Sequence, residues 1–280
     1  MSLPLPSSLS PSKVSAFTDC ALAFRFSAID KVPEAPSAPA VKGNLVHRAL
    51  ELLFLAKPDE RTKAFAHACL ATAWGEYASD ERFLGLGLDE AAAAAFLADA
   101  EAMVERYFTL EDPTEFDPIG VELLLSIELD DLLLRGIIDR LDLLPNGDLV
   151  VTDYKTGRAP TERQEASKLV GVQFYALLCE RLFGKRPAKV QLIYLGANPQ
   201  IIVATPSEQS TRAVERKVGA IWSAVKRSCE SEDFRPKQSP LCSWCSFQQF
   251  CPAFGGDPDA AKTVTLDSTL AAPSAAPLAP

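Results

Sequence analysis

Two consecutive apolar segments, GIIDRLD and VVTDYK, contain the residues with the clearest potential for chemistry, Asp139, Asp153 and Lys155. The loop PNG between them fits a three-residue hairpin turn, because proline suits its first central position and Gly147 the left-handed position. This turn would place Asp139 directly opposite Asp153, with Lys155 two residues further along the same face. Two facing carboxylates among apolar side chains repel each other, and shared protonation or a divalent cation would relieve the repulsion. Carboxylate oxygens favour Mg²⁺ or Mn²⁺.

The same residues allow two other interpretations. A two-residue turn would place Asp139 opposite Tyr154 and send the two carboxylates to opposite faces of the sheet. Asp139 could also form a plain ion pair with Arg140 or Arg135 at a strand end. We prefer the first register because the proline fits it, and it predicts a cation site at Asp139 and Asp153.

A second group of residues suited to metal chemistry lies in the segment LCSWCSFQQFCP, which contains Cys242, Cys245 and Cys251. Thiolates at this spacing favour a tetrahedral metal or an iron-sulfur cluster over disulfides, and three ligands leave one position for a fourth. Cys20 is the natural fourth ligand. The spacing alone does not separate zinc from iron.

The elements that must position these residues follow from hydrophobic periodicity and turn signals. Behind Ser12 as a cap, a first helix carries Cys20, and a second helix in GNLVHRALELLFLA carries His47. Three antiparallel strands are expected between Ile119 and Lys155. A helix, two strands and a long helix then follow over 162–183, 189–196, 200–204 and 206–229.

Composition places the chain among ordinary globular proteins. It has 280 residues, of which 48% are apolar and 23% charged, enough for one sizeable core. No apolar run is long enough to span a bilayer and no secretory signal is apparent, so we expect a cytoplasmic protein without a membrane span. The net charge of −9 argues against binding nucleic acid through bulk electrostatics alone. Residues 155–237 are nevertheless basic, with fifteen Lys and Arg against eight Asp and Glu.

We predict a single domain over most of the chain. Its Ala-rich helical insertion contains no catalytic motif, and the last residues are rich in Thr, Ala, Ser and Pro. The predicted parts are a flexible N-terminus (1–12), the domain (13–255) with the helical insertion (59–115) and a cysteine cluster loop (242–251), and a disordered tail (256–280).

Four short motifs occur together in the order and spacing of one enzyme family. They are GNLVHRALE, GVE, GIIDRLD and TDYKTG. From about residue 10 to 255 the chain resembles the RecB-type nucleases of the PD-(D/E)xK superfamily. The resemblance implies an α/β fold with a restriction-endonuclease-like core, a mixed sheet flanked by helices. It further implies a catalytic set of Asp139, Asp153 and Lys155, and metal ligands His47, Asp139 and Asp153, with the Tyr154 carbonyl and Glu122 as weaker candidates.

One motif departs from the family pattern. The family usually follows the active hairpin with a helix bearing Q-x-x-x-Y, whereas this chain has Gly171 four residues before Tyr175, and its glutamine, Gln173, is displaced by two. On a helix this displacement is a rotation of roughly 200°, which points Gln173 away from the Tyr175 side. Tyr175 and, less directly, Gln173 are carried over as substrate-positioning residues.

Both ends of the chain also resemble the iron-sulfur branch of these nucleases, in which one early and three late cysteines hold a 4Fe-4S cluster, with zinc as the rival. The resemblance implies a Mg²⁺- or Mn²⁺-dependent deoxyribonuclease, an exonuclease on single-stranded DNA ends in DNA repair or processing. The alternative is a non-catalytic DNA-binding or adaptor module that works with a helicase or repair partner. The displaced glutamine favours that alternative, and the intact set of Asp139, Asp153 and Lys155 disfavours it.

Overall fold

The computed structural model describes residues 2–264, with side chains throughout that range except at 162–170, 172, 263 and 264. The chain divides into two compact units, Pro36–Lys217 and the combination of Met1–Ala35 with Val218–Pro280. Of the tail predicted to be disordered, residues 265–280 lie outside the described residues. Within the described part of the chain, no helix combines the length and apolarity that crossing a membrane requires.

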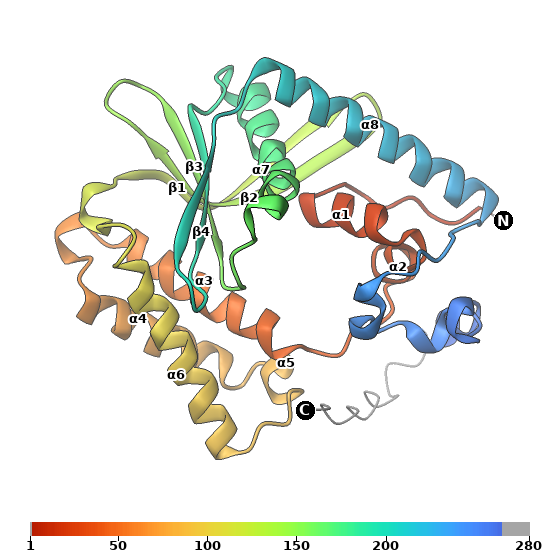
Figure 1. Ribbon diagram of the computed structural model, residues 1–280, viewed down its shortest axis with the longest axis horizontal. Helices are drawn as coiled ribbons and strands as arrows, with labels where there is room; N and C mark the ends of the chain where they lie inside the picture. The colour runs from red at the N-terminus through yellow and green to blue at the C-terminus, as the bar shows by residue number, and fades with distance from the viewer. Residues whose placement is uncertain (1, 265–280) are drawn as a thin grey trace. The chain divides into compact units, whose positions relative to one another are not determined.

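A five-stranded sheet forms the centre of the unit Pro36–Lys217 (Figure 1). Its strands are adjacent in chain order, namely β1 (Pro118–Leu129), β2 (Leu132–Leu143), β3 (Leu149–Lys155), β4 (Lys189–Tyr194) and β5 (Gln200–Ala204). β3 and β4 pair in parallel and all other neighbours are antiparallel, so the sheet is mixed. The parallel pair requires a crossover, which α7 (Glu162–Phe183) supplies. The three antiparallel strands, this helix and the two strands after it confirm the elements predicted from the sequence.

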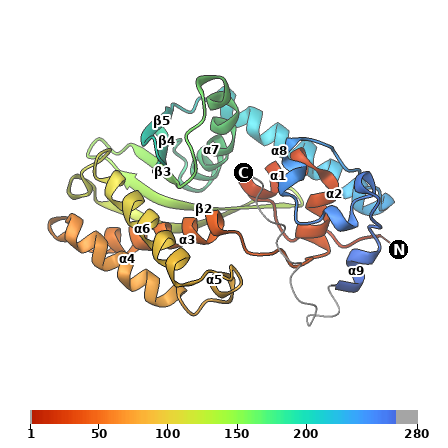
Figure 2. The same cartoon turned by 60° about the horizontal axis from the view of Figure 1, so that its bottom comes forward.

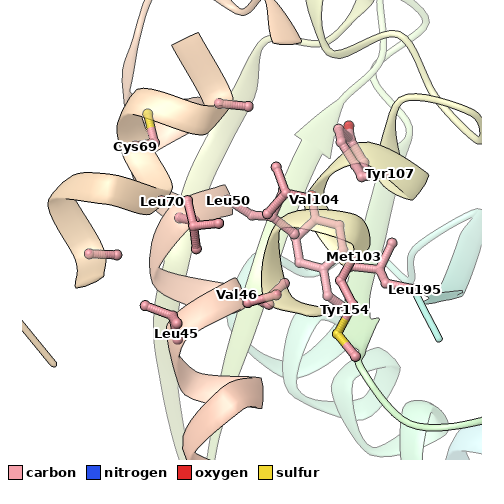
Figure 3. Close-up of a cluster of buried hydrophobic side chains, with 14 of the residues drawn as sticks. Leu45, Val46, Leu50, Cys69, Leu70, Met103, Val104, Tyr107, Tyr154 and Leu195 are labelled. Atoms are coloured by element: carbon pink, nitrogen blue, oxygen red, sulfur yellow. The ribbon is translucent and has the colours of Figure 1, made fainter. Parts of the chain in front are cut away.

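Helices cover both faces of the sheet (Figures 1 and 2). α7 lies on one face, and α3 (Ala38–Leu55), α4 (Lys63–Tyr77) and α6 (Glu90–Tyr107) lie on the other. The short α5 (Glu81–Leu84) and 3₁₀ turns at Pro58–Glu60 and Pro113–Glu115 connect these helices and the sheet. Side chains such as Leu50, Leu70 and Val104 form a buried cluster that includes Tyr154 of β3 (Figure 3). This packing fixes α3, and with it His47, against β3.

The hairpin between β2 and β3 has the predicted register. The Gly147 N–H donates to the Leu144 carbonyl (2.7 Å), the Leu144 N–H donates to the Asp148 carbonyl (2.8 Å), and Gly147 has a φ of 80°. The predicted three-residue loop is therefore confirmed and the two-residue turn is excluded. Backbone pairing then continues along both strands and ends at Arg140 and Thr152.

The other unit contains the four cysteines predicted to be ligands. Its elements are α1 (Pro11–Asp19), α2 (Ala21–Phe24), a π-helical turn (Arg25–Ile29), three 3₁₀ turns (Pro240–Trp244, Gln248–Phe250 and Pro252–Phe254) and α9 (Ala260–Val264). The boundary between the units falls within α8 (Glu208–Ser231).

The prediction of one continuous first helix behind Ser12 is wrong. Ser10 caps the helix, since its hydroxyl accepts the Lys13 N–H (3.3 Å), and the helix ends at Asp19, before Cys20, whose backbone is extended (φ −159°, ψ 111°). Apolar periodicity does not reveal this break because α2 resumes at the next residue. Cys20 therefore lies at a bend between two helices.

Two glycine substitutions test the hairpin assignment. Gly147→Ala should lower the free energy of unfolding by about 1–2 kcal/mol, because a side chain at a left-handed φ is strained. Gly171→Ala is the matched control, since a Cβ there meets no atom within 4 Å and alanine favours a helix by about 1 kcal/mol. Urea denaturation measures both changes. A neutral effect of Gly147→Ala would contradict the assigned turn.

Candidate active site and cysteine site

Asp139 lies where β2 and β3 separate. The last backbone pair of the two strands is Arg140 and Thr152, and beyond it the Asp139 carboxylate accepts a hydrogen bond from the Tyr154 N–H (2.6 Å). The side chain therefore occupies the place that a backbone carbonyl would hold in a continued ladder. Asp139 and Asp153 therefore do not form the regular cross-strand pair expected from the sequence. The hydrogen bond from the Tyr154 N–H anchors the Asp139 carboxylate instead.

α3 brings His47 to the same point. Its Nε2 lies 3.0 Å from the Tyr154 carbonyl oxygen, and because a carbonyl only accepts, Nε2 carries the proton of this hydrogen bond. The Nδ1 atom faces carboxylate oxygens of Glu122 (3.7 Å) and Asp139 (3.6 Å). A histidine with one nitrogen bonded to a backbone carbonyl and the other facing acidic groups has the orientation typical of a metal ligand.

Glu122 has a backbone conformation that is unusual in a strand. Its φ of 47° is left-handed, which costs a non-glycine residue on the order of 1–3 kcal/mol. Its immediate neighbours Val121 and Leu123 pair with Arg140 and Ile138, so Glu122 lies opposite Asp139, and a register shift lies close by, between Pro118 and Gly120. The strain coincides with the position at which the Glu122 carboxylate approaches His47. Backbone strain at such a position is a common mark of a functional site.

His47, Glu122 and Asp139 form a group rich in negative charge. Their ligand atoms all lie within 4.8 Å of one another. Burial and the nearby Asp153 raise the pKa of Asp139 to about 7, against the lowering effects of His47 and the Tyr154 N–H. Burial lowers the pKa of His47, but the three carboxylates outweigh it and the net shift is upward. The donor set therefore fits a divalent cation, which would supply the positive charge that the site lacks.

Asp153, Lys155 and Tyr175 lie beside this group. The Lys155 ammonium forms an ion pair with the Asp153 carboxylate, and the Tyr175 hydroxyl of α7 donates to the same carboxylate (3.4 Å). Burial and the charge of Asp153 raise the pKa of Tyr175, so its hydroxyl keeps its proton. Burial lowers the pKa of Lys155, but Asp153 raises it overall, so the lysine stays cationic.

Gln173 does not join these residues. Its Oε1 accepts a hydrogen bond from the Ser210 hydroxyl (2.8 Å) near the start of α8, whereas Tyr175 points to Asp153. The expected rotation of Gln173 away from Tyr175 is therefore confirmed. Gly171 lies one helical turn before Tyr175 on the same side of α7, and it offers no side chain to the site.

The interpretation in which Asp139 pairs with Arg140 is wrong. The Arg140 guanidinium instead binds the carboxylates of Asp142 (2.9 Å) and Glu111 (2.9 Å). Glu111 lies outside every motif, so the sequence offers no signal for this partner. Arg140 itself indicates only that some acidic partner exists, because a charge in a strand of apolar residues has to be paired when it is buried.

The four cysteines predicted as ligands line one cavity of about 320 Å³. They are Cys20, Cys242, Cys245 and Cys251. Backbone N–H groups donate to the sulfur atoms of Cys20 (3.5 Å, from Lys237) and Cys242 (3.4 Å, from Ser239). Burial raises the pKa of Cys245 and the three neighbouring cysteines add to the increase, partly offset by a backbone hydrogen bond. Cysteines gathered in this way fit a bound metal or cluster, which would hold them as thiolates.

Residues 8–252 match the sequence model of the PD-(D/E)XK nuclease superfamily. The chain belongs to this superfamily. As a PD-(D/E)XK nuclease it is a hydrolase of phosphodiester bonds in a superfamily that uses divalent metal ions. The predicted α/β core, a mixed sheet flanked by helices, is confirmed.

Individual proteins resemble this PD-(D/E)XK nuclease over most of their length. The chain is 25% identical to the Gene 69 proteins of Mycobacterium phage D29 (over 270 residues) and Mycobacterium phage L5 (over 288 residues), and each comparison covers 88% of this chain and 96% of the relative. A crystal structure of a protein from Eubacterium rectale, provisionally named an exonuclease, matches with a TM-score of 0.56 at 11% identity, over 85% of this chain and 87% of its own. That likeness concerns the fold.

Two matched substitutions on β2 test the charge balance. In EDTA at pH 8, Asp139→Asn should raise the free energy of unfolding by about 1–2 kcal/mol, because it removes a buried charge that Asp153 repels. Asp142→Asn should lower it by about 2–4 kcal/mol, because it leaves Arg140 with one carboxylate fewer.

Urea denaturation in EDTA measures both changes, and a saturating concentration of Mn²⁺ should make the wild type more stable than Asp139→Asn. A loss of stability on Asp139→Asn in EDTA would contradict the electrostatic account of the site.

Proposed function

We propose that this nuclease hydrolyses DNA with a divalent ion, Mg²⁺ or Mn²⁺, held by His47, Asp139 and Asp153 together with Glu122. The observation that carries the proposal is the convergence of an imidazole and buried carboxylates from separate elements, beside an ion-paired lysine. A divalent ion bound there would polarise the scissile phosphate and lower the pKa of a water molecule.

The other residues have separate roles in this proposal. Lys155 provides a positive charge beside the acidic group, where it would orient the attacking water or neutralise the charge that develops on the phosphate. Asp153 holds Lys155 through their ion pair, and Tyr175 donates to Asp153. Tyr175 would therefore act on the substrate through Asp153. Gln173 is bonded to Ser210, and this proposal gives it no role.

We infer that cleavage is exonucleolytic, at single-stranded DNA ends, in DNA repair or processing. The support comes from the resemblance to the RecB-type nucleases and from the fold shared with the protein provisionally named an exonuclease. The net charge of −9 would repel DNA, and the basic residues concentrated at 155–237 would offset that repulsion.

We also propose that the four cysteines hold a 4Fe-4S cluster. A tetrahedral zinc ion, with zinc–sulfur bonds of about 2.3 Å, would place its sulfur ligands about 3.8 Å apart. Among the residues that the structure describes, the cysteines form no group of three whose sulfur atoms lie within 4.8 Å of one another. A cluster that offers one iron to each thiolate needs such wider spacing. Its role would be structural, because it would connect the bend at Cys20 to a loop more than 200 residues later.

A non-catalytic DNA-binding or adaptor module, which would work with a helicase or repair partner, is the second candidate. The observation that favours it is the missing glutamine, since Gly171 has no side chain and Gln173 is bonded elsewhere. The buried carboxylates argue against it, because a structural module gains no stability from acidic groups that repel one another.

A nuclease assay separates the two candidates. Anaerobically purified protein should release nucleotides from labelled single-stranded DNA with Mn²⁺ and not with EDTA. Asp153→Ala and Lys155→Ala should each lower the rate at least about 100-fold, as expected when charge stabilisation in the transition state is lost. Arg82→Ala is the control, because Arg82 pairs with Asp80 outside the basic segment 155–237, and it should keep the wild-type rate.

An inactive wild type with a complete cluster would favour the adaptor. Wild-type activity of Asp153→Ala would overturn the assignment of the active site.

The cluster proposal has its own measurement. Protein purified without oxygen should be brown, with broad visible absorbance and about four iron and four sulfide per chain. Cys245→Ser should lose the colour and most of the iron, whereas Cys69→Ala, which changes a buried cysteine of the other unit, should keep both. A colourless protein that contains one zinc per chain would contradict the proposal.

A further inference from the structure

Arg140 is a fully buried charge whose guanidinium is held by four side chains. Its Nε donates to Asp142 (2.9 Å), and its Nη atoms donate to the two carboxylate oxygens of Glu111 (2.9 and 3.3 Å). Nη1 also donates to the hydroxyls of Tyr107 (3.3 Å) and Tyr154 (3.0 Å). Bonds to charged groups are stronger than neutral ones, so this position of the guanidinium is well defined.

Aromatic rings and a second layer of polar contacts fix the guanidinium further. The ring centroids of Phe116 and Phe54 lie 4.3 and 4.7 Å from its central carbon. Gln191 donates to Glu111 (2.8 Å) and to the Thr152 hydroxyl (2.9 Å). A planar cation with five donors suits this site, and the single ammonium of a lysine does not.

Tyr154 connects this buried network to the acidic group. Its hydroxyl accepts the hydrogen bond from Arg140, its N–H donates to Asp139 (2.6 Å), and its carbonyl oxygen lies 3.0 Å from Nε2 of His47. Figure 3 shows the Tyr154 side chain within the buried cluster, with Tyr107 nearby. One residue thus binds the guanidinium through its side chain and two candidate metal ligands through its backbone.

β3 needs this support because β2 no longer pairs with it at Tyr154. Backbone pairing with β2 ends at Thr152, and β4 holds only the other edge of β3, where Tyr154 pairs with Ile193. On the β2 side, Tyr154 is held by the Asp139 carboxylate and by Arg140. A small displacement of Tyr154 would therefore move the atoms that orient Asp139 and His47.

We propose that Arg140 is a positioning residue that sets the divalent-ion affinity of the site, acting through the Tyr154 hydroxyl on the backbone atoms that orient Asp139 and His47. The inference rests on the proposed metal-dependent function. Groups that orient metal ligands typically change affinity by about 10–100-fold when they are removed. Arg140 acts one residue further from the ion, so the effect is at the lower end of that range.

Two tyrosines provide a matched test, because each accepts a hydrogen bond from Nη1 of Arg140 and only Tyr154 also contacts Asp139 and His47. Tyr154→Phe keeps the ring in place and removes the hydroxyl. It should raise the Kd for Mn²⁺, measured by calorimetry on the full chain with its cluster, by about tenfold. Tyr107→Phe removes a hydroxyl from the same network and should change that Kd by less than about twofold.

Arg140→Lys tests the same connection between Arg140 and Tyr154 while both tyrosines stay unchanged. It should raise the Kd for Mn²⁺ as Tyr154→Phe does, and the double variant should show no further increase, since both changes break one connection. Unfolding midpoints of all variants record purely structural damage, which Tyr107→Phe should share.

The outcomes separate the two proposals. Equal Kd values for Tyr154→Phe and Tyr107→Phe, with Mn²⁺ binding by the wild type intact, would overturn the role of Arg140 alone. A wild type that binds no Mn²⁺ would overturn the proposed function, and this inference with it.

Discussion

The buried negative charge where β2 and β3 separate is the constraint on which the rest of the site depends. Glu122, Asp139 and Asp153 come close together in a place where water screens them poorly, and His47 and Lys155 supply too little positive charge to balance them. The fold must therefore hold these mutually repelling groups together by other means. The packing of α3 on β3, the left-handed backbone at Glu122 and the anchor of Asp139 on the Tyr154 N–H do so.

Asp139 and Arg140 are buried charged residues next to each other on β2, and their charges are balanced in opposite ways. Successive residues of a strand point to opposite faces, so Asp139 and Arg140 enter different environments. Arg140 is a buried cation surrounded by two carboxylates and two aromatic rings, and it needs no further ion. Asp139 is a buried carboxylate among other carboxylates, and a cation would offset their repulsion. Tyr154 contacts both residues, so in our proposal the Arg140 network would support the acidic group that would hold the ion.

The features of the site that depend on local sequence could be predicted. The PNG loop defined the hairpin register because only glycine adopts its left-handed position without strain, and the strands that carry Asp139 and Asp153 followed from that register. The break of the first helix at Cys20, the strain at Glu122 and the pairing of Arg140 with Glu111 were not predictable in this way. Each depends on groups distant in sequence or on a backbone distortion, and neither leaves a signal in hydrophobic periodicity. Gln173 is an intermediate case, because helix geometry alone predicted that it turns away from Tyr175.

The acidic site requires that backbone pairing between β2 and β3 stops where it does, because a longer ladder would take up the backbone groups that the site uses. If pairing continued past Arg140 and Thr152, Tyr154 would lie opposite Ile138 and its N–H would find a backbone acceptor. The Asp139 carboxylate would then lose the donor that anchors it, and His47 would have to compete with a closed strand for the Tyr154 carbonyl. The lost backbone bonds cost stability, and the side chains of Asp139, His47 and Arg140 replace them. The hairpin is regular near its loop, which sets the register of the two strands. It is open at its far end, which leaves backbone polar groups free to bond the side chains of the acidic group.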